Sequence, residues 1–299
     1  MQALPRSVGD ARLRRSTNQT AKGAQVSESN FRVIPLDGPL GARIDDIDLR
    51  KPIEPHFVEK LRELLFEHQL LFFRDQALDN ADHIRFASYF GEPNVYPLTK
   101  MLGREEPIEF VWDGPDRRPT AAGWHTDVTW LPDPPKIGVL YAQVIPERGG
   151  DTLWCSLYSL YDALSEEERV DLNDLEVHNA AGPFFIELVV KSLDEKLVEP
   201  FIDQYGDGAR HSLVCEHYVT GRPLLYLCGG FMDHVVGMGR SEGRALLQRL
   251  MERVDDPSCQ IRWEWAVNDL AIWDERSTMH RVDASHWPEP RRMRRCTVS

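Results

Sequence analysis

The sequence predicts a mainly β protein, a β-sandwich or jelly roll with helices packed on one face. Two observations predict this class. Short apolar runs bounded by turn residues fill the centre and the end of the chain, as expected for strands. Stretches with helical periodicity occur early and late, at residues 55–69 and 241–254. Helices that flank such a run of strands are typical of a sandwich with one covered face.

The N-terminal part begins with short apolar runs after Phe31 and continues into two helices. The stretch PHFVEKLRELLFEHQ places large apolar residues between Phe57 and Leu65 at helical spacing, with Pro55 near its start. This pattern predicts an amphipathic helix, because proline is favoured in the first turn and the apolar residues share one face. A second helix is expected at residues 80–90.

The rest of the chain alternates loops and short strands. Residues 103–123 are rich in proline, glycine and charge, so we expect a loop there. The runs WHTDVTW, IGVLYAQVI and DTLWCSLY are expected strands, and Ser165 with Glu168 predicts a capped short helix. The final strands are expected in IRWEWAV, DLAIWDE and RRCTVS. Because no internal repeat or second core is evident, residues 30–299 are predicted to form one domain.

Residues 1–29 differ in composition from the rest of the chain. They are rich in arginine and poor in large apolar side chains, which predicts a disordered tail. The alternative is a mitochondrial-type transit peptide, which has a similar composition, but the segment lacks a strong apolar face.

Charge and cysteine content restrict the partners and the compartment. Acidic residues outnumber basic ones by 48 to 35, so the surface should repel nucleic acid and anionic lipid. No apolar run reaches the about 18 residues that a membrane helix needs. The five cysteines form no CxxC pair and are odd in number, which suits a reducing cytoplasm better than a disulfide framework.

One short motif carries metal-ligating residues. On a strand, His125 and Asp127 of WHTDVTW would point to the same face and could hold one metal ion. Alone, the HxD motif is equally compatible with two polar neighbours on a surface strand. Iron(II) oxygenases need two imidazoles and one carboxylate, and His280, just after the apolar run DLAIWDE, could supply the second imidazole from a strand end.

Seven of the other eight histidines carry weaker signals. Four have no acidic partner at ligand spacing and are expected to be structural: His68, His83, His234 and His286. Three lie in the middle region, where one is a candidate for lining a substrate pocket: His178, His211 and His217.

An arginine cluster near the end of the chain suits a dicarboxylate ligand. If RRMRRCTVS is a strand, Arg291 and Arg295 point to one face, and Arg292 and Arg294 to the other. Arginine pairs with a carboxylate bidentately and stays charged, so it suits the distal carboxylate of a 2-oxo acid. A solvated basic cluster is the alternative for this segment.

Together these motifs resemble the taurine dioxygenase (TauD/TfdA) family of iron(II)/2-oxoglutarate oxygenases, which includes alkylsulfatases and phenoxyalkanoate dioxygenases. The resemblance runs from about Phe31 to the end and rests on LGARIDDIDL, LLFFRDQ, WHTDVTW, GGDTLW, VNDLAIWDERSTMHR and RRMRRCTV. It implies a double-stranded β-helix fold and a dioxygenase that uses Fe(II), with 2-oxoglutarate and O2 as co-substrates. Iron would be held by His125, Asp127 and His280.

The resemblance also implies a 2-oxoglutarate site. Thr152 of GGDTLW would contact a carboxylate, and Arg291, eleven residues after His280, would pair with the distal carboxylate. Arg295, fifteen residues after His280, matches an arginine that holds the substrate's acidic group in some members and 2-oxoglutarate in others. Both roles stay open. Halogenation is not expected, because halogenating relatives have a small residue in place of Asp127.

Substrate preference is expected to differ from that of taurine-using members. In FGEPNVYPLTK, Tyr96 and Thr99 stand where those members have histidine and tyrosine, and PLTK is closer to phenoxyalkanoate-using relatives. Further substrate-binding positions are expected at Val128, Trp130, Phe184, Phe185 and Phe231. Large apolar side chains of this kind would surround an apolar body. We therefore expect a small organic acid with an apolar or aromatic body to be hydroxylated, giving succinate and CO2.

Two alternatives to this function remain open. A biosynthetic oxygenase of the same kind would catalyse desaturation or another oxidative step, because these outcomes diverge only after hydrogen abstraction. A non-catalytic metal-binding jelly-roll protein is the alternative from another class, but it leaves Thr152, Arg291 and Arg295 unexplained. The family resemblance also suggests a homodimer or homotetramer. It further suggests that the natural chain continues beyond RRCTVS.

Overall fold

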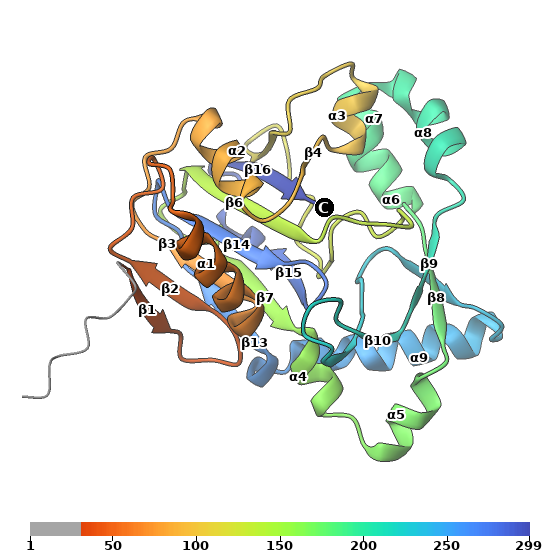
Figure 1. Cartoon of the computed structure of the whole chain (residues 1–299). Coiled ribbons are helices and arrows are strands. Elements are labelled where there is room, and N and C mark those ends of the chain that lie inside the picture. Colours follow the sequence, from red (N-terminus) through yellow and green to blue (C-terminus); the bar gives the residue numbers. More distant parts are fainter. Residues whose placement is uncertain (1–30) are drawn as a thin grey trace, which may run out of the picture.

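The computed structural model describes residues 31–299 (Figure 1), so the predicted tail at residues 1–29 lies outside the described residues. The strands are β1 (Arg32–Pro35), β2 (Ala42–Asp45), β3 (Leu70–Phe73), β4 (Pro93–Asn94), β5 (Glu109–Asp113), β6 (Ile137–Val144), β7 (Thr152–Ser156), β8 (Glu176–Asn179), β9 (Ala209–Ser212), β10 (Val214–Glu216), β11 (Pro223–Leu225), β12 (Met232–Val235), β13 (Gln260–Trp263), β14 (Leu270–Asp274), β15 (Thr278–Val282) and β16 (Arg291–Val298). The α-helices are α1 (Pro55–His68), α2 (Asn80–Ser88), α3 (Pro97–Met101), α4 (Leu157–Asp162), α5 (Glu166–Leu172), α6 (Pro183–Phe185), α7 (Lys191–Leu193), α8 (Val198–Tyr205) and α9 (Arg240–Glu252). A π-helical turn, η1 (Ile186–Val190), and four 3₁₀ turns complete the elements: η2 (Glu195–Leu197), η3 (Arg253–Asp255), η4 (Pro257–Cys259) and η5 (Ala284–His286).

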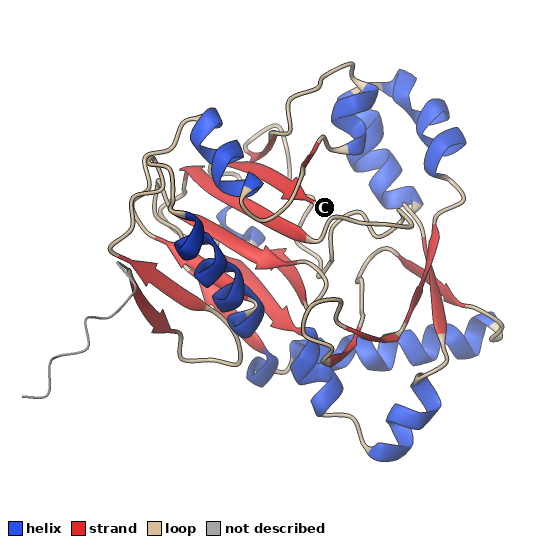
Figure 2. Cartoon of the chain, in the orientation of Figure 1, coloured by secondary structure: helices blue, strands red, loops and turns tan. Residues whose placement is uncertain are grey.

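Two sheets face each other across an apolar core. The larger sheet has the order β1-β2-β3-β14-β6-β16-β4, with β5 also paired to β16, and the smaller one has the order β13-β7-β15. Side chains from both sheets meet between them, including Phe72, Trp154, Trp273 and Met293. The structure is mainly sheet with flanking helices and the sheets do not close into a barrel (Figure 2), which confirms the predicted jelly-roll class.

Helices cover the outer face of the larger sheet. The helix α1 buries Leu61, Leu64 and Leu65 against this sheet, and α2 adds Phe86 to the same core. Both lie against one face of the sheet in Figure 1, as the apolar periodicity of the two segments predicts. The capped helix α5 and the late helix α9 are also confirmed, with a capping box at the start of α5.

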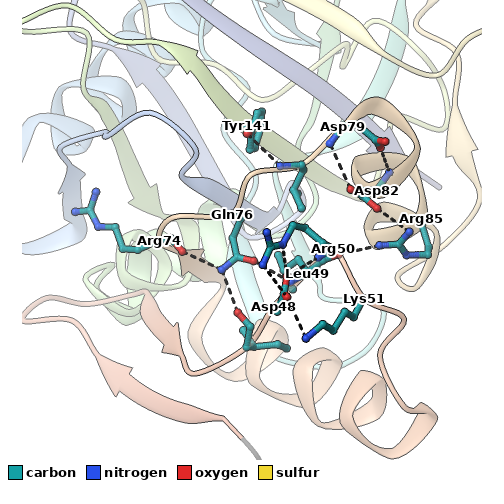
Figure 3. Close-up of polar contacts among 12 residues, drawn as sticks. Asp48, Leu49, Arg50, Lys51, Arg74, Gln76, Asp79, Asp82, Arg85 and Tyr141 are labelled. Atoms are coloured by element: carbon teal, nitrogen blue, oxygen red, sulfur yellow. Dashed lines mark hydrogen bonds and ion pairs between the residues drawn. The ribbon is translucent and has the colours of Figure 1, made fainter.

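A buried amide connects the segment before α1 to the segment before α2 (Figure 3). The Gln76 side chain accepts a hydrogen bond from Leu49 N at 2.8 Å and donates to Ile47 O at 3.1 Å. Arg85 of α2 donates to Leu49 O at 2.9 Å, and Tyr141 Oη of β6 accepts a bond from Leu78 N. These contacts satisfy backbone groups that would otherwise be buried without partners, and they hold α2 against the sheet that carries β16.

Alternation along the strands brings four of the predicted site residues to the inner faces of the two sheets. On β16, Met293 lies in the inner core, so Arg291 and Arg295 share its face. On β7 and β15, Trp154 pairs with His280, and Trp154 also lies in the inner core. Thr152 lies two residues before Trp154 on β7, so the two side chains point to the same face. The two-residue period of β-strands therefore places the arginines opposite Thr152 and His280.

Three local expectations are wrong. Residues 103–123 contain the strand β5, because EFVWD alternates between a partly buried face and an exposed face. Residues 124–130 form no strand, as described below. His280 lies in the middle of β15 and not at a strand end, because the turn after Asp274 lets the chain re-enter the smaller sheet.

No helix among residues 31–299 combines the length and the apolar character needed to cross a membrane.

Acid should destabilise the fold through His83 of α2. This side chain is fully buried, and burial, with the nearby Arg294 charge, lowers the pKa of His83 from 6.5 to about 3. In the unfolded chain His83 therefore becomes protonated near pH 6.5, whereas in the folded chain it becomes protonated only near pH 3. Stability is at its full value above pH 6.5 and is lost as the pH falls from 6.5 toward 3, by about 2 kcal/mol at pH 5.

A matched variant tests this contribution. His83→Asn keeps an acceptor for Arg294 Nε, which donates to His83 Nδ1 at 3.1 Å, but it cannot titrate. We expect urea denaturation to show a smaller loss of unfolding free energy between pH 7 and pH 5 in the variant. Parallel pH curves for the two proteins would contradict the assignment.

Candidate active site

The structure brings together the three residues that the sequence predicts as metal ligands. His125 and His280 form a mutual backbone bridge, with N to O distances of 3.0 and 2.9 Å, and their ring centroids lie 4.3 Å apart. Asp127 Oδ1 is 3.8 Å from His125 Nε2. One ligand atom from each of the three side chains lies within 4.8 Å of the others. Two imidazoles and a carboxylate can thus reach one ion.

The predicted strand over WHTDVTW is wrong, although its residues do meet. His125 makes only isolated bridges, to His280 and to Gly229, and residues 127–130 form a turn with Val128 at φ 47°. The chain leaves the sheet because Thr126 Oγ1 donates to Thr278 O at 3.2 Å and so satisfies a strand carbonyl with a side chain. A turn therefore brings Asp127 beside His125, where strand alternation was expected to do so.

Gly229 is required for this close approach, and no motif in the sequence indicates this role. Its φ of +60° lies in the left-handed region, and a Cβ there would lie 1.7 Å from Trp124 O. Any larger residue at position 229 would push the Trp124–His125 backbone away from residue 229 and so displace His125.

Hydrogen bonds and burial keep the three side chains in their metal-binding forms. His125 Nδ1 lies 2.8 Å from Gly123 O, so it carries the proton and leaves Nε2 with a free lone pair. Burial lowers the pKa of His125, and it lowers the pKa of His280 to about 3. Burial acts to raise the pKa of Asp127, but the charge and hydrogen bond of Arg295, together with the two histidines, outweigh it and lower the pKa to about 2. His280 Nδ1 is buried without a hydrogen-bond partner among the described residues, so the donor set fits a divalent metal.

Arg295 is fully engaged by two carboxylates. Its Nη1 donates to Asp127 Oδ2 at 2.5 Å, and its Nε and Nη2 donate to Glu109 Oε2 at 3.0 and 2.6 Å. The guanidinium also lies 5.3 Å from the centre of the Tyr96 ring. Glu109 lies on β5, directly opposite Arg295 in the β5–β16 ladder. The charge of Arg295 is therefore compensated within the protein.

Arg291 and Thr152 lie together on the inner faces of β16 and β7. Arg291 Nη2 donates to Thr152 Oγ1 at 3.3 Å, and Arg291 Nε donates to Gly150 O at 2.8 Å. Trp265 Nε1 donates to the same threonine oxygen at 2.9 Å. Burial lowers the pKa of Arg291 to about 10, so the side chain is still charged at neutral pH.

A cavity of about 240 Å³ opens beside the two ligands His125 and Asp127. The predicted substrate residues that line it are Tyr96, Val128, Phe184, Phe185, Phe231 and Arg295. Trp130 lies behind this wall, with its ring 4.7 and 4.8 Å from the rings of Phe185 and Phe231. Thr99 lines a larger neighbouring cavity of about 700 Å³. None of the candidates His178, His211 and His217 lines the smaller cavity.

Three charged residues near the triad were missed from the sequence. Glu109 and Arg117 line both cavities, and Glu275 Oε2 accepts a hydrogen bond from Asp127 N at 3.3 Å. The signal for Glu109 was the alternating EFVWD pattern, hidden in a stretch whose composition indicates a loop. Nothing in the sequence separates Arg117 from Arg118, or Glu275 from a surface acid.

Comparisons with known proteins support the resemblance. The family model described as "Taurine catabolism dioxygenase TauD, TfdA family" matches residues 32–297. An alkylsulfatase from Acinetobacter baylyi is 32% identical over 272 residues, which covers 88% of this chain and 83% of that protein. An alpha-ketoglutarate-dependent 2,4-dichlorophenoxyacetate dioxygenase from Cupriavidus pinatubonensis is 29% identical, covering 88% of this chain and 96% of that protein.

A solved structure agrees with the fold. The crystal structure of a taurine dioxygenase from Burkholderia xenovorans superposes with a TM-score of 0.74 at 28% identity, covering 90% of this chain and 91% of that chain. The chain therefore belongs to the TauD/TfdA family and is an iron(II)- and 2-oxoglutarate-dependent dioxygenase, with O2 as its second co-substrate.

Proposed function

We propose that this enzyme hydroxylates a C–H bond of a small organic acid with an apolar or aromatic body, with iron held by His125, Asp127 and His280. The observation that carries this proposal is the mainly apolar cavity that opens directly onto His125 and Asp127. A substrate body in this cavity would present its carbon atoms to the metal.

The ligand set suits the metal of this family. Two neutral imidazoles and one carboxylate from a buried site leave coordination positions for other ligands. When bound, iron supplies the redox chemistry that couples decarboxylation of 2-oxoglutarate to oxidation of the substrate by O2, giving succinate and CO2. The protein contributes ligand geometry, substrate orientation and exclusion of water.

For 2-oxoglutarate, we propose Arg291 and Thr152 as the binding residues. Arg291 keeps its charge in a buried position and still has hydrogen-bond donors that neither Gly150 nor Thr152 uses. The Thr152 hydroxyl is oriented by Trp265. A dicarboxylate beside these groups would accept a charge-assisted hydrogen bond from the guanidinium of Arg291, which is buried and therefore poorly solvated.

The sequence leaves two roles open for Arg295, binding the substrate's acidic group or binding 2-oxoglutarate. We favour a role at the substrate. It lines the same cavity as Phe184, Phe185 and Phe231, whereas Arg291 contacts Thr152 outside this wall. Its bond to Asp127 also orients that carboxylate toward the histidines. Because Glu109 and Asp127 already compensate Arg295, it is unsuited to hold the substrate's acid by itself.

Arg117 is the better partner for the substrate's acidic group. Its guanidinium forms no ion pair or side-chain hydrogen bond with the described residues and lies 4.9 Å from the centre of the Trp112 ring. It lines both cavities, so an acid held there could extend its apolar body toward Phe231. An arginine without a partner at the edge of an apolar cavity is suited to bind a sulfate, sulfonate or carboxylate.

A substrate panel tests this assignment. We would measure succinate formed from 2-oxoglutarate with alkyl sulfates, alkyl sulfonates and phenoxyalkanoates, in wild type and in Arg117→Gln. We expect KM for the best acid to rise about tenfold or more in the variant, since one charge-assisted hydrogen bond is worth about 1.5–3 kcal/mol. Turnover of 2-oxoglutarate without substrate should not change.

The matched control is Arg118→Gln. Arg118 is the next residue but stacks on Trp287, with 4.4 Å to the ring centre, and lines neither cavity. Equal KM values for wild type and Arg117→Gln would show that Arg117 does not bind the substrate's acidic group. A desaturated product in place of a hydroxylated one would favour the second candidate outcome for the same enzyme.

The cell compartment and assembly of the enzyme are also proposed. We propose a cytoplasmic homodimer or homotetramer, and the five cysteines, all in the free form, are consistent with a reducing compartment. Size-exclusion chromatography with light scattering would give the number of subunits.

A further inference from the structure

A second group of metal-ligating side chains lies outside the active site. It consists of His178 on β8 and of Asp233 and His234 on β12. His178 Nδ1 is 3.5 Å from Asp233 Oδ2, and His234 Nδ1 is 2.8 Å from the same oxygen. The two imidazole centroids are 4.9 Å apart. We define these three residues as the β8–β12 cluster.

From the sequence, His234 is expected to have no acidic partner at ligand spacing, and this expectation is wrong because Asp233 contacts it. Consecutive residues on a regular strand point to opposite faces, so Asp233 and His234 should diverge. The β8–β12 ladder is irregular, however: Met232 pairs with Asn179 and His234 with His178, which leaves Asp233 as an extra residue between them. Such a bulge redirects side chains. It allows both neighbours to face His178.

The proton on His178 leaves a lone pair directed at the cluster. His178 Nε2 lies 2.8 Å from Asp207 O, and a carbonyl only accepts, so Nε2 carries the proton. Nδ1 is then unprotonated in the neutral ring. It is buried from solvent and has no hydrogen-bond partner among the described residues. A carbonyl that holds the distal nitrogen of a histidine is the usual arrangement behind a metal-ligating imidazole.

We propose that the β8–β12 cluster binds a divalent transition metal such as Zn²⁺ through His178, Asp233 and His234. Two imidazoles and one carboxylate form a ligand set that zinc accepts, with water completing the coordination. The His178 side chain is 20% exposed, and those of Asp233 and His234 are 44% and 39% exposed, so water can reach the open positions. None of the three residues lines the cavity beside His125 and Asp127, so this metal site would be structural or regulatory.

The position of the cluster gives the metal a consequence for the substrate cavity. Phe231 directly precedes β12, and Ala180, directly after β8, donates its N–H to Phe231 O at 2.9 Å. Gly182, Phe184 and Phe185 follow on the same chain segment and line the cavity. A metal that links His178 to His234 would clamp the two strands from which this apolar wall extends. It should reduce the mobility of the wall without contacting the substrate.

The test is the number of zinc ions bound per full-length chain. We would use equilibrium dialysis against Zn²⁺ followed by elemental analysis, with wild type, His234→Ala, His178→Gln, His125→Ala and the control His56→Ala. His178→Gln retains an amide that can donate to Asp207 O. His56 is an exposed histidine that belongs to neither group. Circular dichroism would check the fold of each variant.

We expect two zinc ions per chain in wild type and in His56→Ala, and one in each of the other three variants. Zn²⁺ should also raise the Tm of His125→Ala, where only the β8–β12 cluster remains. The proposal is overturned if His234→Ala and His178→Gln bind as much zinc as wild type. If zinc binding depends on His234 but not on His125, the cluster stands and the proposed iron site is wrong instead.

Discussion

Replacing His125 by alanine is expected to abolish substrate-dependent succinate formation, with a loss of about a thousandfold or more in kcat/KM. The imidazole is one of the three proposed ligands, and it lies against Asp127 and His280 in a buried site. Bound metal contributes several kcal/mol to a transition state, and about 4 kcal/mol corresponds to about a thousandfold in rate.

The loss should arise from the ligand and not from the fold. His125 also joins the backbone bridge to His280, which the alanine variant keeps because only main-chain atoms take part. We therefore expect thermal denaturation of metal-free wild type and variant to agree within a few degrees. Substantial activity in an iron-loaded His125→Ala protein that binds iron normally would show that the ligand set is wrong.

The second large effect is expected at Arg291. Arg291→Gln should raise KM for 2-oxoglutarate about 100-fold, because a buried guanidinium that makes charge-assisted bonds to a carboxylate is worth about 1.5–3 kcal/mol for each bond. KM for 2-oxoglutarate in Arg291→Lys should lie between the values for wild type and Arg291→Gln, since lysine keeps the charge but lacks the planar guanidinium. Initial rates of succinate formation at varied 2-oxoglutarate would give these values.

A neighbouring arginine supplies the control. Arg292 is exposed on the other face of β16 and stacks on Phe110, 4.6 Å from the ring centre. Arg292→Gln should leave KM for 2-oxoglutarate unchanged. If Arg291→Gln lowers kcat while KM for 2-oxoglutarate stays the same, Arg291 does not bind this co-substrate.

Regular elements were predictable where local patterns decide the structure. The helix α1 follows from its apolar spacing and Pro55, and α5 from the capping box of Ser165 with Glu168. Alternation on β16 correctly assigned Arg291 and Arg295 to one face and Arg294 to the other, where Arg294 contacts α2. In these elements the neighbours along the chain contain the required information.

Tertiary contacts decided the features that the sequence did not reveal. The turn after Asp127 depends on the Thr126 hydroxyl reaching Thr278, 152 residues later, and the bridge to His125 depends on Gly229. The pairing of Arg295 with Glu109 depends on a strand hidden in a stretch rich in charge. The β8–β12 cluster depends on a bulge, which shifts the side-chain alternation by one residue and is not marked by glycine or proline.

The most direct test of the proposed centre is a visible absorption spectrum. Fe(II) and 2-oxoglutarate would be added anaerobically to wild type, His125→Ala and Arg291→Gln, and the weak charge-transfer band of the iron chelate would be recorded. We predict a band in wild type that saturates at one iron per chain, no band in His125→Ala, and a band in Arg291→Gln that needs far more 2-oxoglutarate. A band of equal intensity and equal 2-oxoglutarate dependence in all three proteins would contradict the assignment of both the metal ligand and the co-substrate site.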